Sequence, residues 1–210
     1  MGLDWNPGPK PRTGSEDEFL SLWHRLQSRW CWNRPAKLKR LQEVTITAFD
    51  TLGTPRVGVD ETANQWARQA FTRNSDKARS EDEFIREMSG FYVLDLVAPC
   101  DGVPRYSNGS AGGYVERYSF RGQFLTDCVE IIGNDLLEAA YRSKLPDDTA
   151  RYGEALLGRA TAFAAQKEID TTRSQTDDPD SIESHLDVVL SAGRWCRFWS
   201  KRGHWLEAYW

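Results

Sequence analysis

Residues 15–30 read SEDEFLSLWHRLQSRW, and this stretch indicates how much of the chain folds. Ser15 and Glu18 match a capping box, because the hydroxyl and the carboxylate can satisfy free backbone amides in the first turn of a helix. Apolar residues then recur at helical spacing: Phe19, Leu22, Trp23, Leu26 and Trp30. The stretch predicts an amphipathic helix with this whole stripe, Trp23 and Trp30 included, in the core.

The same kind of pattern continues along the chain, and the pentapeptide SEDEF occurs again at 80–84. Helical spacing runs from Pro35 to Leu52, where we expect a helix although VTIT at 44–47 also suits a strand, and resumes after Asp60. Two long helices, at about 120–144 and 147–169, are separated at Pro146 and should form an antiparallel pair. Further helices are expected from Ser80 toward Pro99 and over about 180–201, where Gly203 ends the last one.

Proline and glycine mark the two segments without helical periodicity. Residues 1–14 contain three prolines and read as an extended arm, and residues 98–113 form a long loop rich in glycine and proline. We therefore expect an all-α fold in which residues 15–210 form a single irregular helical domain. This domain should have about five to seven helices, one long Gly/Pro-rich loop, and little or no strand.

Composition excludes several classes of protein. The 210 residues are 40% hydrophobic and 28% charged with a net charge of −4, which is too apolar for a disordered chain and unlike collagen. Cys31, Cys100, Cys128 and Cys196 lie far apart without C-x-x-C spacing, so neither a disulfide framework nor a zinc ribbon is indicated. With no secretory or membrane-spanning pattern, we expect a cytoplasmic protein that does not contact a membrane.

The charge is unevenly distributed. Residues 19–42 and 188–206 hold ten basic residues and no acid, which leaves 17 basic and 31 acidic residues elsewhere. The same two windows hold six of the nine tryptophans, Trp23, Trp30, Trp32, Trp195, Trp199 and Trp205. For the first window, an amphipathic helix with its arginines on a solvated outer face is one explanation, and a binding surface is the other. In the second window, Trp195 and Trp199 lie nearly opposite the aliphatic face, so that helix is either buried between two layers or presents an aromatic patch.

Cations interleaved with aromatic rings are typical of binding surfaces. Cations neutralise phosphate and flat rings stack on bases, and the same combination suits the acidic surface of a protein partner. We therefore expect a non-enzymatic binding or regulatory protein whose ligand is an acidic protein or a phosphate-bearing molecule; nucleic acid has only weak support. The predicted contacts are Arg29, Arg34, Trp195, Arg197 and Trp199.

The alternative interpretation is an enzyme of unknown reaction with a pocket under the 98–113 loop. That loop carries the densest set of reactive side chains, Cys100, Asp101, Arg105, Tyr106 and Asn108. Its cysteine has an acid as its neighbour, which opposes formation of a thiolate. No nucleotide-binding motif is present, and the spacings of histidine and cysteine are not those of a zinc site. We expect neither a cofactor nor a metal.

Overall fold

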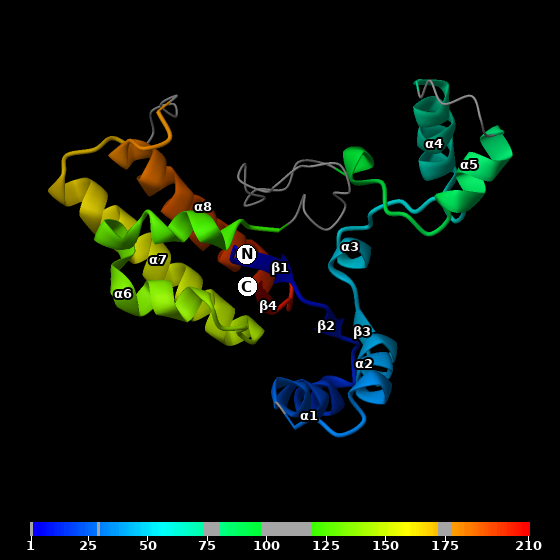
Figure 1. Ribbon diagram of the computed structural model, residues 1–210, viewed down its shortest axis with the longest axis horizontal. Coiled ribbons are helices and arrows are strands. Elements are labelled where there is room, and N and C mark those ends of the chain that lie inside the picture. Colours follow the sequence, from blue (N-terminus) through cyan, green and yellow to red (C-terminus); the bar gives the residue numbers. More distant parts are fainter. Residues whose placement is uncertain (1, 29, 74–79, 98–118, 172–177) are drawn as a thin grey trace. The chain divides into compact units, whose positions relative to one another are not determined.

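The computed structural model describes residues 2–28, 30–73, 80–97, 119–171 and 178–210. These residues are mostly helical, with eight α-helices and two antiparallel two-stranded sheets (Figure 1), which confirms the predicted all-α class. By its contacts the chain divides into two compact units, one formed by Met1–Ala48 with Cys100–Trp210 and the other by Phe49–Pro99. That residues 15–210 form a single domain stays a prediction, and the 98–113 loop lies outside the described residues.

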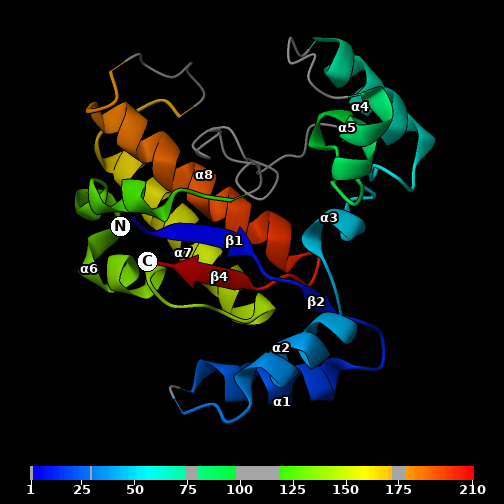
Figure 2. The same cartoon turned by 45° about the vertical axis from the view of Figure 1, so that its right-hand side comes forward.

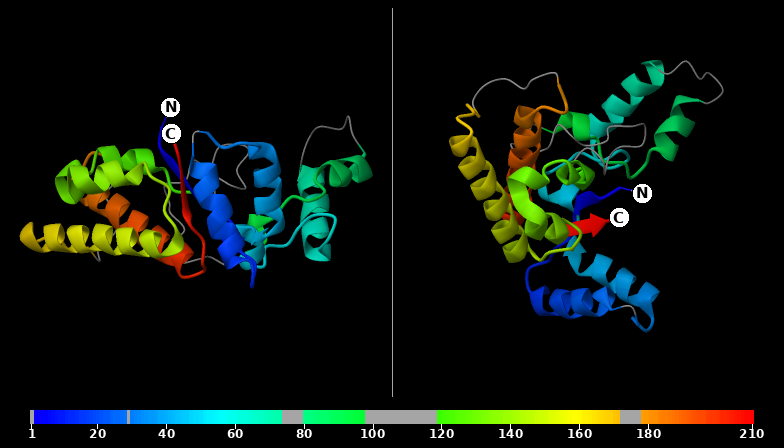
Figure 3. Two further views of the ribbon diagram at one scale, coloured as in Figure 1. Left: turned by 90° about the horizontal axis from the view of Figure 1, so that it is seen from below. Right: turned by 60° about the vertical axis from the view of Figure 1, so that its left-hand side comes forward.

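Three helices, α6 (Val129–Ala140), α7 (Pro146–Gln166) and α8 (Ile182–Ser200), form the main body of the first unit. The pairing of α6 with α7 is antiparallel, as predicted: Glu130 and Asp135 on α6 form ion pairs with Lys167 and Arg159 respectively. Helices α7 and α8 pack together most extensively and lie side by side in Figure 3 (yellow and orange). Their backbones meet where Gly153 and Gly193 face each other.

The two ends of the chain pair in a short sheet beside these helices. Strand β1 (Asp4–Pro7) runs antiparallel to β4 (Leu206–Tyr209), and the two lie side by side in Figure 2. The 3-10 helix η3 (Gly122–Thr126) lies next to β1, and Trp5 of β1 bonds through its backbone with Phe120. The predicted N-terminal arm is thus extended, and its Trp5 and Leu3 side chains are completely buried.

Helices α1 (Glu16–Gln27) and α2 (Arg34–Glu43) form a hairpin that belongs to the same unit. After α2 the chain turns into β3 (Thr45–Ile46), which pairs with β2 (Lys10–Pro11). The prediction of one helix from Pro35 to Leu52 is therefore wrong, because a short strand interrupts it. The β-branched residues at 45–46 form the strand, and only the short α3 (Ala48–Thr51) follows.

The second unit contains α4 (Glu61–Arg73), α5 (Glu81–Glu87) and the 3-10 helix η1 (Leu94–Leu96). Helix α4 begins directly after Asp60, as predicted, whereas the helix that begins after Ser80 ends well before Pro99. A small core holds the unit together, and its fully buried members are Val57, Ala63, Ala67 and Val93.

Candidate functional site

The structure places the two predicted contact tryptophans of α8 in the core. Trp195 and Trp199 are both completely buried, so neither side chain belongs to a binding surface. Helix α8 contacts α7, and on the side of the N-terminal arm the Trp195 ring lies 5.8 Å from the ring of Trp5. Helix α8 is therefore buried between two layers and does not present an aromatic patch. Helix α7 forms one layer and the N-terminal arm, through Trp5, forms the other.

Arg197, on the same helix, is exposed but already has a partner. Its guanidinium group donates two hydrogen bonds of 2.9 Å to the carboxylate of Glu154 on α7. The hydrogen bonds with Arg197 lower the pKa of Glu154, and those with Glu154 raise the pKa of Arg197. A pair of this kind on the surface joins two helices and leaves Arg197 little free charge for a ligand.

The remaining predicted residues are only partly described. Arg29 lies outside the described residues, as do Cys100, Asp101, Arg105, Tyr106 and Asn108 of the alternative enzyme site. Arg34 is described and exposed, at the start of α2. Of the predicted contact residues, Arg34 is therefore the one that lies beside a candidate binding surface.

That site is the turn between α1 and α2, where two tryptophans point into solvent. Trp30 is 93% exposed and Trp32 is 87% exposed, the two highest values among the large hydrophobic side chains described. Cys31, between them, packs instead against the cluster of buried side chains beneath the hairpin. We call Trp30, Trp32 and the flanking cations Arg25, Arg34 and Lys37 the hairpin tip.

Hydrogen bonds to backbone carbonyls hold the hairpin tip together. Arg34 donates to the carbonyl of Leu26 in the last turn of α1 over 2.9 Å, and the Lys37 ammonium donates to the carbonyl of Trp32. Asn33 adopts the left-handed conformation with φ of +53°, which asparagine tolerates better than most residues. Both cations therefore bond to the backbone at the turn that carries the exposed tryptophans.

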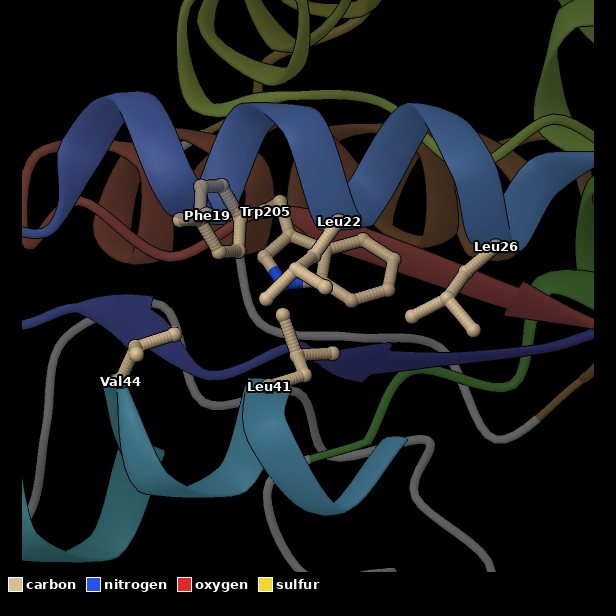
Figure 4. Close-up of a cluster of buried hydrophobic side chains, with 6 residues drawn as sticks. All are labelled: Phe19, Leu22, Leu26, Leu41, Val44 and Trp205. Carbon is tan, nitrogen blue, oxygen red and sulfur yellow. The ribbon is translucent and has the colours of Figure 1, made fainter. Parts of the chain in front are cut away.

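Below the hairpin tip, a hydrophobic cluster anchors α1 and α2 to the C-terminal segment. Figure 4 shows its six members, in which the Trp205 ring lies among side chains of both helices: Phe19, Leu22, Leu26, Leu41, Val44 and Trp205. Trp23 meets Trp205 edge to face, with ring centroids 6.2 Å apart. The α1–α2 hairpin is therefore held by a packed hydrophobic cluster. The two basic windows contact each other there, at the buried Trp205.

The acidic residues of the hairpin are at its other end. Glu18 near the start of α1 accepts bonds of 2.7 and 2.9 Å from Arg40, and Glu43 accepts one of 3.0 Å from the same side chain. From Glu18 to the end of α1 the helix rises about 14 Å, more than the Debye length of about 10 Å at 0.1 M salt. The structure shows no ion pair with a described residue for Arg25, Arg34 or Lys37, so the hairpin tip keeps its positive charge.

Other reactive groups in the described part of the chain have roles in packing. Burial raises the pKa of Cys196, and of Cys128, to about 12, so both remain thiols that are poor nucleophiles at neutral pH. Among the described residues there is no group of three or more histidine, cysteine or acidic side chains that could hold a metal ion. No helix among them is long and apolar enough to cross a membrane.

No family model, curated protein or solved structure matches this chain significantly.

Sequence reasoning placed Trp30 in the core because it continues the apolar stripe of α1. The helix ends at Gln27, however, and its C-cap Ser28 is extended with ψ of 132°, so the periodicity no longer applies to Trp30. A signal was present in the sequence WCWNRP at 30–35: a turn-forming asparagine followed by a proline that starts a helix. Tryptophans inside a turn have no helical face to occupy.

Proposed function

We propose that this chain is a binding protein that recognises an anionic partner through the hairpin tip. The observation that supports the proposal is the near-complete exposure of Trp30 and Trp32 in a turn flanked by Arg25, Arg34 and Lys37, which form no ion pair with an acid of the described ranges. Single apolar side chains on a surface are ordinary, but two almost fully exposed indoles within one short turn are an apolar surface of the kind that marks interaction sites. The negatively charged remainder of the chain would disfavour an anion elsewhere.

The size of the exposed rings supports an interaction of useful strength. A buried tryptophan removes about 150–250 Å² from water, worth about 4–6 kcal/mol per ring at about 25 cal/mol/Å². In the folded chain Trp30 and Trp32 remain exposed, so they do not contribute this free energy of burial to folding. A partner that covers both rings would gain part of it, and the cations would attract and orient that partner.

The first test removes charge from the hairpin tip. In the double variant Arg25→Gln and Lys37→Gln, both residues keep a hydrogen-bond donor, so the turn should survive while two charges are lost. Binding is measured by anisotropy or co-sedimentation at low and moderate salt with three anionic probes, namely a single-stranded oligonucleotide, a polyglutamate peptide and phosphatidylserine vesicles. We expect at least one probe to bind, and its affinity to fall about tenfold or more in the variant.

The control changes the same amount of charge elsewhere. Arg151 and Arg159 are exposed on α7 and form ion pairs with Asp148 and Asp135. Replacing both arginines with glutamine should leave the affinity within about threefold, because these charges are already neutralised by their partners. The proposal fails if none of the three probes binds, or if the α7 variant loses as much affinity as the tip variant.

A further inference from the structure

The two rings of the hairpin tip have faces that no protein side chain covers. With exposed fractions of 93% and 87%, Trp30 and Trp32 leave their flat surfaces open to solvent. The buried tryptophans differ in this respect: Trp5, for example, has Phe120, Tyr152 and Trp195 within about 6 Å of its centroid. Open faces of this kind are stacking positions for a flat partner.

Trp30 and Trp32 lie close together along the chain. They are two residues apart, so their Cα atoms are separated by at most about 7 Å. With exposed fractions of 93% and 87%, neither ring covers the other, and Cys31 between them packs against the core cluster. Each ring therefore offers a stacking position of its own to neighbouring bases of one strand.

The charges beside the rings match a chain of phosphates. A single nucleic acid strand brings one phosphate for each base, and Arg25, Arg34 and Lys37 offer three cations within seven residues of both tryptophans along the chain. Arg34 and Lys37 are already held in place through carbonyl contacts, so little side-chain entropy remains to be lost on binding. No described acid lies on the hairpin between Phe19 and Gln42 to repel a phosphate.

We propose that the ligand of the hairpin tip is a single-stranded nucleic acid, with bases stacked on Trp30 and Trp32 and phosphates on the three cations. This inference rests on the proposed function and specifies its ligand. An acidic protein surface would satisfy the cations but has no requirement for two open ring faces. Because both rings are almost fully exposed, few side chains surround a bound base to form hydrogen bonds with its edges. We therefore expect binding with little sequence preference.

The experiment compares ligands that differ only in their bases. A fluorescently labelled 12-nucleotide oligothymidylate is titrated with the full chain and compared with an abasic strand of the same length and charge. Stacking contributes a factor of roughly 5 to 150 per base, so the oligothymidylate should bind at least about fivefold more tightly. For three phosphate contacts, log K should fall with log salt at a slope of about −2, since each contact contributes about −0.7 for a single strand.

Ring variants provide the second readout. Trp30→Leu with Trp32→Leu keeps apolar area but removes flat faces, and should weaken oligothymidylate binding roughly 5- to 150-fold for each base released. Trp30→Phe with Trp32→Phe keeps a stacking face and should retain most of the affinity. Trp210→Leu is the matched control, because Trp210 is 72% exposed and lies outside the hairpin tip. All of these residues are exposed, so the variants should fold, and thermal unfolding verifies that they do.

Each outcome separates this inference from the proposed function. If the abasic strand and the oligothymidylate bind with equal affinity, base stacking is overturned. If, in that case, the Arg25→Gln and Lys37→Gln variant binds neither strand, the proposed recognition of an anionic partner still holds. Binding of polyglutamate or phosphatidylserine vesicles without binding of the oligonucleotide overturns the inference in favour of an acidic protein or a membrane surface. If the Leu variant binds oligothymidylate as the unchanged chain does, the inference is overturned. If no anionic probe binds at all, both proposals fail.

Discussion

Gly8 shows how a single residue sets the path of the N-terminal arm. Its amide donates a 2.8 Å hydrogen bond to the carbonyl of Trp205, and the Trp205 ring nitrogen donates one of 2.9 Å to the carbonyl of Pro9. A β-carbon on residue 8 would lie 2.1 Å from an atom of the Trp205 ring. The buried ring is held by the hairpin cluster, so it has little freedom to move away.

We predict that Gly8→Ala lowers the free energy of unfolding by about 1–3 kcal/mol, the usual cost of forcing an atom into a packed core. The control is Gly158→Ala in the exposed middle of α7, where an added β-carbon would meet no atom within 4 Å. That change should raise stability by about 0.5–1 kcal/mol, because alanine is the better helix former. Urea unfolding measures both, and a tolerated Gly8→Ala would contradict the packing described for Trp205.

At the scale of elements, the repeated pentapeptide SEDEF forms two different helix starts. Before α5, the Ser80 hydroxyl accepts a bond from the amide of Glu83, and the Glu83 carboxylate accepts one from the amide of Ser80. Before α1, Ser15 makes no side-chain cap, and the equivalent carboxylate, Glu18, binds Arg40 of α2 instead. The predicted capping box is therefore confirmed at Ser80 and wrong at Ser15.

We predict that Ser80→Ala destabilises the start of α5 by about 1 kcal/mol, the usual cost of losing a side-chain cap. Ser15→Ala should change stability by less than about 0.5 kcal/mol, since no cap bond is lost. Amide hydrogen exchange over residues 81–87 and 16–22 measures each helix start separately. Equal effects at the two sites would show that the box forms at both.

The packing of α8 explains why Trp195 and Trp199 are buried and not on a surface. Periodicity indicated correctly that α8 is apolar on two sides, but not which elements cover it. The covering comes partly from Trp5, nearly two hundred residues away in the sequence. Trp30 shows the opposite error, since a residue that continues a helical stripe loses its burial when the helix ends three residues earlier.

At the scale of the whole first unit, contacts between its two ends close the structure. His204, completely buried just before β4, lies with Nδ1 2.8 Å from the carbonyl oxygen of Gly8 and edge-on to Trp199 at 5.3 Å. A carbonyl can only accept, so this ring nitrogen carries the proton. Burial lowers the pKa of His204 to about 4, opposed by the bond with Gly8 and assisted by Lys10 and Arg202.

We predict that His204 lowers the free energy of unfolding as the pH falls below about 6.5. In the unfolded chain histidine has a pKa near 6.5, so between about pH 6.5 and 4 the unfolded state binds the proton and the folded state does not. Stability present above pH 6.5 should therefore decline by roughly 3 kcal/mol as the pH falls to 4. Urea unfolding at each pH measures it. His204→Asn keeps a donor for Gly8 and cannot titrate, so its curve should be flatter; an equal slope would exclude His204 as the source.

The amino-acid sequence by itself determined the all-α class, most helix positions, the extended arm and the concentration of positive charge in two windows. These properties follow from local periodicity, turn residues and composition, which neighbouring residues specify. The tertiary structure alone decided which side chains meet: Glu18 binds Arg40 and leaves Ser15 uncapped, Trp5 covers Trp195, and Trp30 and Trp32 remain in solvent. Burial and pairing depend on segments distant in sequence, and periodicity along one helix carries no information about those segments.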